Sequence, residues 1–165
     1  MSRTLLVARE AFVAALTQDT PGTDLPRLVA VLDALIAWSV ARPAVLEFRA
    51  DARGKGGVSF ARVGSRAAFW SAQVTRGVGP RLEIHLPSAD ALDDARQASV
   101  MQTLNAHSRA VLMEGDRLRI GFGALKNAAA QAAVLALMDQ LVADRDAPAE
   151  SSPAESSPAE PSRPA

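Results

Sequence analysis

Basic side chains gather between residues 42 and 81 of the sequence, around an aromatic pair at Phe69 and Trp70. Guanidinium and ammonium groups bind phosphates and carboxylates, and an exposed ring beside them would offer a surface for stacking a nucleic-acid base. The stretch holds eight basic residues and two acidic ones, so we expect an anionic partner, either nucleic acid or an acidic protein. The candidate binding residues are Arg49, Arg53, Lys55, Arg62, Arg66, Phe69, Arg76 and Arg81.

Three acids in or beside this stretch, Glu47, Asp51 and Glu83, raise a second possible chemistry. Carboxylates on neighbouring strands can hold a magnesium ion, which activates water and neutralises the leaving oxygen in a nuclease. The lysine that would accompany them is missing, and cross-strand ion pairs with Arg49 and Arg81 explain the same acids. We therefore expect no metal and no cofactor, and we keep a small metal-dependent hydrolase or nuclease as an alternative function.

The other candidate motifs lack a catalytic pattern. His85 and His107 are the two histidines and lie on different expected elements, whereas a zinc site needs at least three converging protein ligands. The Gly-Val-Gly at 77–79 joins two expected strands and opens no helix, so it does not fit a dinucleotide-binding turn. No Gly-x-Ser-x-Gly sequence provides a nucleophile elbow. We expect no catalytic residues, and a binding or adaptor module rather than an enzyme.

An antiparallel sheet is expected to carry the basic residues. Its apolar positions alternate with polar ones, and Gly-rich turns separate the segments. Because neighbouring side chains on a strand point to opposite faces, we expect Trp70 in the core and Phe69 on the outer, polar face. The expected strands are 45–50, 57–63, 67–75 and 81–86, followed by a hairpin within 111–122.

Helices are expected to cover the apolar face of this sheet. The resulting prediction is a two-layer α+β domain with the order αα-ββββ-α-ββ-α. The helices at 25–41 and 125–143 are apolar over most of their circumference, which predicts a homo-oligomer and leaves open a structural, oligomeric protein that binds no nucleic acid. The expected helices are 4–17, 25–41 with Asp24 as its N-cap, 88–107 and 125–143.

Composition divides the chain into two parts. We expect one globular domain over 1–145 and a disordered acidic tail over 146–165, where Pro, Ala, Glu and Ser recur in a five-residue repeat without apolar anchors. Arg9 and Glu10 interrupt the first apolar segment, so it resembles neither a signal peptide nor a membrane span. The sequence contains no cysteine. We expect a cytoplasmic protein without a membrane partner.

Overall fold

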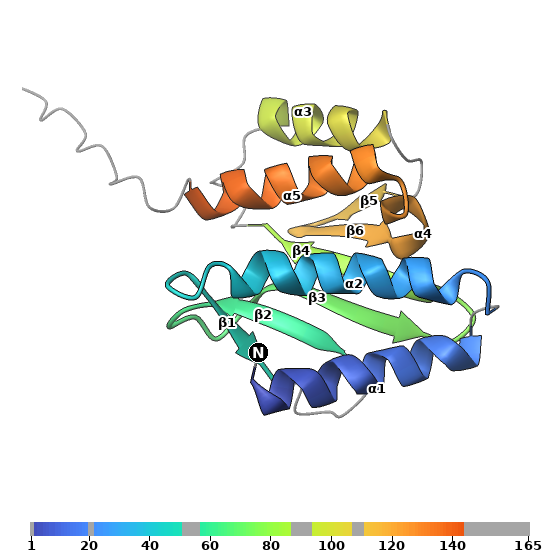
Figure 1. The fold of residues 1–165 in the computed structure, drawn as a ribbon. Helices are drawn as coiled ribbons and strands as arrows, with labels where there is room; N and C mark the ends of the chain where they lie inside the picture. Colours follow the sequence, from blue (N-terminus) through green and yellow to red (C-terminus); the bar gives the residue numbers. More distant parts are fainter. Residues whose placement is uncertain (1, 20–21, 51–56, 87–93, 107–110, 144–165) are drawn as a thin grey trace, which may run out of the picture.

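A six-stranded antiparallel sheet, with strand order β1-β2-β3-β4-β6-β5, forms the framework of the protein (Figure 1). The computed structural model describes residues 2–19, 22–50, 57–86, 94–106 and 111–143. Sequential strands pair from β1 to β4, and the C-terminal hairpin adds to β4 through β6. The strands are β1 (Leu46–Arg49), β2 (Val58–Arg62), β3 (Ala68–Thr75), β4 (Gly79–His85), β5 (Val111–Glu114) and β6 (Arg117–Gly121).

The helices lie together on one face of this sheet (Figure 1). The α+β class and the order of the main elements are therefore confirmed. The short helix α4 was not expected: the predicted hairpin ran to Phe122, which instead begins α4 and packs its ring against Phe12 at 5.6 Å. The helices are α1 (Arg3–Asp19), α2 (Leu25–Val40), α3 (Asp94–Asn105), α4 (Phe122–Leu125) and α5 (Ala128–Ala143).

The aromatic pair on β3 breaks the expected alternation. Phe60 pairs with Trp70 across the β2–β3 ladder, but the next residue, Ala61, pairs with Ala68. Phe69 is thus the extra residue of a β-bulge, which lets two successive side chains turn toward the same face. Phe69 and Trp70 are 3% and 0% exposed. The prediction that Phe69 faces outward is wrong, because the bulge shifts the register by one residue.

The two buried rings contact different parts of the core. Trp70 stacks on Phe60 with ring centroids 5.2 Å apart, while Phe69 stacks on Trp38 of α2 at 6.3 Å. Arg62 covers the Phe69 ring with its guanidinium carbon 5.0 Å from the centroid. These contacts connect the bulge to α2 and to the end of β2.

A buried hydrogen bond connects α2 to strand β3 of the sheet. The Trp70 Nε1–H donates to the Ser39 Oγ at 2.9 Å, and this hydroxyl donates to the Leu35 carbonyl one turn earlier at 2.9 Å. Ser39 is fully buried. A buried indole N–H needs an acceptor, so the serine within the apolar helix α2 satisfies the one polar atom of the largest core residue.

The apolar circumference of α2 is covered within a single chain. The helix contacts α1, α4, α5 and β1. Asp33 accepts two hydrogen bonds from Arg9 of α1, at 2.6 and 2.7 Å, and Asp139 of α5 accepts from Trp38 at 3.2 Å and from Arg42. The packing around α2 therefore accounts for its composition without a second subunit, and the homo-oligomer stays a prediction.

Among the described residues, no helix combines the length and apolar character that crossing a bilayer requires. The expected tail at 146–165 lies outside the described residues.

Replacing Phe69 tests the burial imposed by the bulge. We expect Phe69→Ala to lower the free energy of unfolding by about 3–5 kcal/mol, as for other buried aromatic residues, because the cavity lies between β3 and α2. Val63→Ala is the control, since Val63 is 54% exposed in the next turn and should cost less than about 0.5 kcal/mol. Denaturant unfolding measures the free energy of unfolding of both variants. An equally small decrease in the two variants would contradict the buried position of Phe69.

Replacing Ser39 tests the indole hydrogen bond. We expect Ser39→Ala to cost about 1–3 kcal/mol, because it leaves the Trp70 N–H buried without an acceptor. In a Trp70→Phe background the same change should cost clearly less, since no donor remains to be satisfied. Equal costs in the two backgrounds, measured by denaturant unfolding, would show that the hydrogen bond does not contribute.

Candidate functional site

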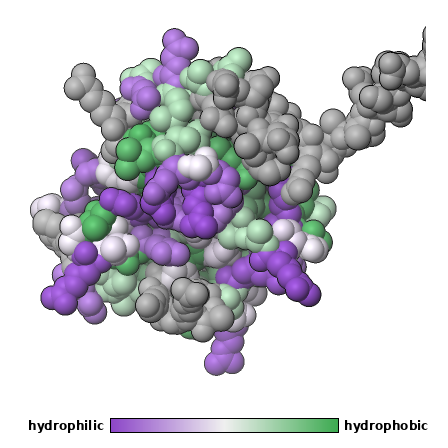
Figure 2. Space-filling view, turned by 180° about the vertical axis from the view of Figure 1, so that it is seen from behind, coloured by the Kyte–Doolittle hydropathy of each residue, from purple (hydrophilic) through white to green (hydrophobic). Residues whose placement is uncertain are grey.

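Polar side chains form the sheet face opposite the helices. The strand pairings place Arg49, Ser59, Ser71, Glu83 and Arg119 directly beside one another, on β1, β2, β3, β4 and β6 in turn. Within the described ranges no helix packs over this face, and Figure 2 shows hydrophilic side chains gathered on it. We call it the open face.

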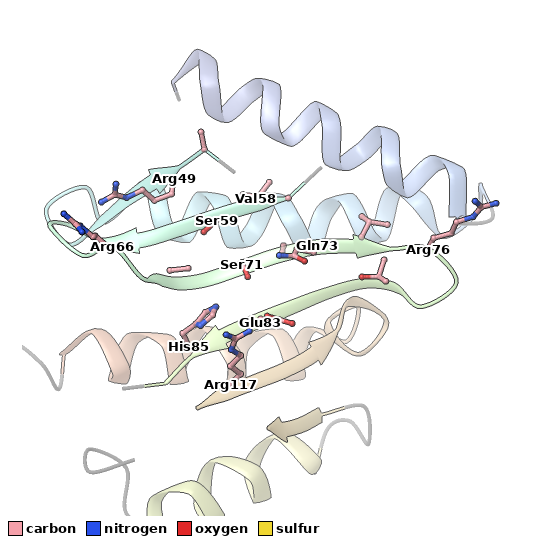
Figure 3. A pocket seen from close by; sticks show the side chains of 16 residues that line it. Arg49, Val58, Ser59, Arg66, Ser71, Gln73, Arg76, Glu83, His85 and Arg117 are labelled. Atoms are coloured by element: carbon pink, nitrogen blue, oxygen red, sulfur yellow. Dashed lines mark ion pairs between the residues drawn. The ribbon is translucent and has the colours of Figure 1, made fainter. Parts of the chain in front are cut away.

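A hollow of about 960 Å³ lies on the open face. Ser59 and Ser71 line it between the long basic side chains at its ends, as Figure 3 shows, and Ala68 is a further small lining residue. Figure 3 shows Arg49 and Arg66 near one end of β3 and Arg76 at its other end. We call this hollow the trough. Its polar lining consists of Arg49, Ser59, Arg66, Ser71, Gln73, Thr75, Arg76, Glu83, His85 and Arg117.

The four arginines of the trough are exposed and weakly held. Arg66 and Arg76 have no ion-pair partner among the described residues. Arg49 pairs with Glu47 at 2.6 Å, yet both side chains are about half exposed. Arg117 lies 3.9 Å from a carboxylate oxygen of Glu83. An exposed pair such as Arg49–Glu47 contributes only about 0–1 kcal/mol, and the 3.9 Å between Arg117 and Glu83 is too long for a hydrogen bond, so these guanidinium groups can exchange partners at little cost.

The acid in the trough lining is already neutralised. Glu83 has a side chain only 19% exposed, and its carboxylate accepts a hydrogen bond from the Arg119 Nε at 2.9 Å. Arg119 also pairs with Glu114 at the end of β5. The hollow therefore presents an excess of positive charge to any molecule that enters it.

His85 lines the trough beside Arg117, its partner across the β4–β6 ladder. Burial lowers the pKa of the His85 imidazole below its usual value, and the positive charge of Arg117 lowers it further. The carboxylates of Glu83 and Asp116 oppose this shift. The ring is accordingly neutral at pH 7 and acts there as a hydrogen-bonding group rather than as a cation.

The structure brings only some of the predicted binding residues into the trough. Arg49, Arg66 and Arg76 line it, and Arg81 lies on the open face opposite Gln73 but outside the lining. Arg53 and Lys55 lie outside the described residues.

Two predicted members of the binding surface belong to the helix side. Arg62 shares a strand face with buried Phe60, and its guanidinium donates to the Leu141 carbonyl at the end of α5 at 2.6 Å. It does lie over Phe69, as the sequence suggested, but on the covered face. The expected exposed stacking ring is thus absent, and including Phe69 and Arg62 in the open surface was wrong.

Sequence analysis overlooked His85 and Arg117 as members of the site. Neither is among the candidate binding residues, because the pairing of the C-terminal hairpin with β4 was not predicted, and this pairing brings Arg117 to the trough. The sequence feature that could have pointed to Arg117 is the alternation of Arg117 and Arg119 with the apolar residues Leu118 and Ile120. This alternation marks one polar face on β6.

The candidate magnesium acids do not meet. Glu47 on β1 and Glu83 on β4 are separated by three strand spacings, or about 14 Å, which is too far for two ligands of one ion. Asp51 lies outside the described residues. The part of the chain that the structure describes contains no cluster of three or more acids or histidines suited to a metal.

Comparisons of this chain with protein-family models, with curated proteins and with solved structures found no match.

Stability at mildly acidic pH tests the environment of His85. Because its folded pKa lies below the unfolded value of about 6.5, the unfolded chain binds the proton more readily, and stability should fall as pH drops below about 6.5. We expect His85→Gln to flatten this part of the curve. Melting temperatures between about pH 7.5 and 5.5 measure the effect, with His107→Gln as the control for losing a histidine. An unchanged slope in His85→Gln would contradict the assignment.

Proposed function

We propose that the protein is a non-enzymatic binding module that holds an extended, acidic polypeptide in the trough of its open face. The observation that carries this proposal is the excess positive charge of the hollow: four exposed arginines surround it, and Arg119 neutralises its glutamate. A concave surface of one charge sign concentrates the electrostatic field and raises the local concentration of an opposite charge.

The length of the trough favours a polymer over a compact anion. Arg49 and Arg66 stand near one end of β3 and Arg76 follows its other end (Figure 3). An eight-residue strand is about 25 Å long, so one phosphate or carboxylate cannot contact both ends. A chain with spaced acidic groups can contact both.

The chemistry between the arginines favours a polypeptide over nucleic acid. The hydroxyls of Ser59 and Ser71 and the amide of Gln73 can bond to peptide groups along an extended chain. Single-stranded nucleic acid gains about 1–3 kcal/mol per base by stacking on aromatic side chains. The trough lining contains no phenylalanine or tryptophan, so nucleic acid would rely on its phosphates alone.

Charge reversal at the two ends of the trough tests this function. We expect Arg66→Glu with Arg76→Glu to weaken binding of a fluorescent poly-glutamate peptide at least tenfold, because both end contacts become repulsive. Both residues are exposed, so stability should change by less than about 0.5 kcal/mol per substitution. Wild-type binding should also weaken between about 50 and 200 mM salt through screening. Fluorescence anisotropy measures each affinity.

The matched control changes the same net charge on the helix side. Arg3→Glu with Arg27→Glu alters two exposed arginines of α1 and α2, and we expect affinity to remain within about twofold of wild type. Equal losses in both double variants would mean that overall charge, and not the trough, determines binding. Tighter binding of an oligo-thymidine of matched length would make nucleic acid the partner instead.

A further inference from the structure

The end of α5 lies beside the end of the trough that holds Arg49 and Arg66. The Leu141 carbonyl accepts a hydrogen bond from Arg62, the last residue of β2, at 2.6 Å. In the following turn the Ser65 carbonyl accepts from Arg49 at 2.8 Å. Figure 1 shows α5 ending at the same end of the molecule as the β2–β3 turn. The end of α5 therefore lies next to the turn beside two of the four trough arginines, Arg49 and Arg66.

The sequence after α5 has the composition of a partner for this trough. Residues 144–165 contain five acidic and two basic residues, and they contain neither an aromatic residue nor a large aliphatic side chain. Glu150, Glu155 and Glu160 recur every five residues, each within a Pro-Ala-Glu triplet. Prolines at this density favour an extended chain, in which each residue advances about 3.1 Å.

The reach of this segment matches the trough. Twenty-two residues at about 3.1 Å each cover almost 70 Å, more than twice the roughly 25 Å of β3. Glu150 and Glu160 would lie about 31 Å apart in the extended chain. Arg66 and Arg76 are likewise ten residues apart and flank β3. Glu150 can therefore contact the arginines at one end of the trough while Glu160 contacts Arg76 or its neighbours at the other, or the reverse.

We infer that residues 144–165 bind the trough of their own chain and compete there with the acidic partner, an inference that rests on the proposed function of the trough. Individual exposed ion pairs are weak, but a tethered segment has an effective concentration on the order of millimolar. Weak contacts are then enough for partial occupancy. An incoming partner must displace the segment, so only a more acidic or better-matched chain binds.

The test uses the full chain with its acidic repeat neutralised. The triple variant Glu150→Gln, Glu155→Gln and Glu160→Gln is compared with wild type by amide NMR spectra at low salt. We expect the signals of Ser59, Ser71 and Gln73 to shift in the variant, because the tail no longer contacts the trough. The matched control, Ser151→Ala, Ser156→Ala and Ser162→Ala, keeps the charge and should leave these signals in place.

Unchanged trough signals in the glutamine variant overturn the inference and leave the segment a passive tail. Shifts that disappear on dilution also overturn it, because they would assign the contact to the tail of a second copy. Shifts of equal size in the alanine control overturn the charge-based contact. Concentration-independent shifts confined to the glutamine variant support it.

A second measurement separates this inference from the proposed function. Poly-glutamate should bind the glutamine variant several-fold more tightly than wild type, since the competing segment is weakened. Equal affinities would overturn the competition. Absence of poly-glutamate binding by both proteins would overturn the proposed function, whereas the NMR comparison would still decide whether the tail contacts the trough.

Discussion

The bulge on β3 is the constraint on which the rest of the structure depends. It turns Phe69 and Trp70 to the same face, so that one strand supplies two large rings to the helix side. Trp70 then hydrogen-bonds to Ser39 and Phe69 stacks on Trp38, two neighbouring residues of α2. The position of α2 over the sheet is thereby fixed by polar and apolar contacts at once.

The same bulge determines the character of the opposite face. A regular β3 would have placed the Phe69 ring among the arginines, where it would fill the trough and offer a stacking surface. With the ring buried, the residues left on that face of the strand are small or hydrophilic, chiefly Ala68, Ser71 and Gln73. A packing requirement of the core thus leaves a hollow on the outside, surrounded by long side chains.

Much of the fold could be predicted from sequence because its signals are local. Turn residues and alternating apolar positions located the strands, and the assignment of Trp70 to the core was confirmed. The bulge could not be predicted, because an extra residue becomes visible only when the partner strand is in place. One residue of register was enough to misplace Phe69.

The site was less predictable than the fold because it depends on non-local pairing. The alternation of apolar and polar residues places Arg49 and Arg81 on the polar face of the sheet. It does not show that Arg49 borders the hollow and Arg81 does not, because this depends on how the strands are arranged. Addition of β6 beside β4 brings Arg117 close to His85, and Arg119 to Glu83. The charge count over residues 42–81 therefore included three of the four trough arginines but not Arg117, and the ion pair expected for Glu83 named Arg81 where the structure has Arg119.

An open sheet face must be hydrophilic in any soluble domain, so polarity alone does not distinguish a binding surface from a solvated one. Whether an arginine already has an ion-pair partner within the fold is more informative about binding. Arg9 and Arg119 each have a carboxylate at 2.9 Å or less, and their charges are satisfied within the fold. Arg66 and Arg76 lack such a partner among the described residues and also border the two ends of a concave surface. Arg27, an exposed arginine of α2, does not line this hollow, so shape and not charge alone favours the trough as the binding site.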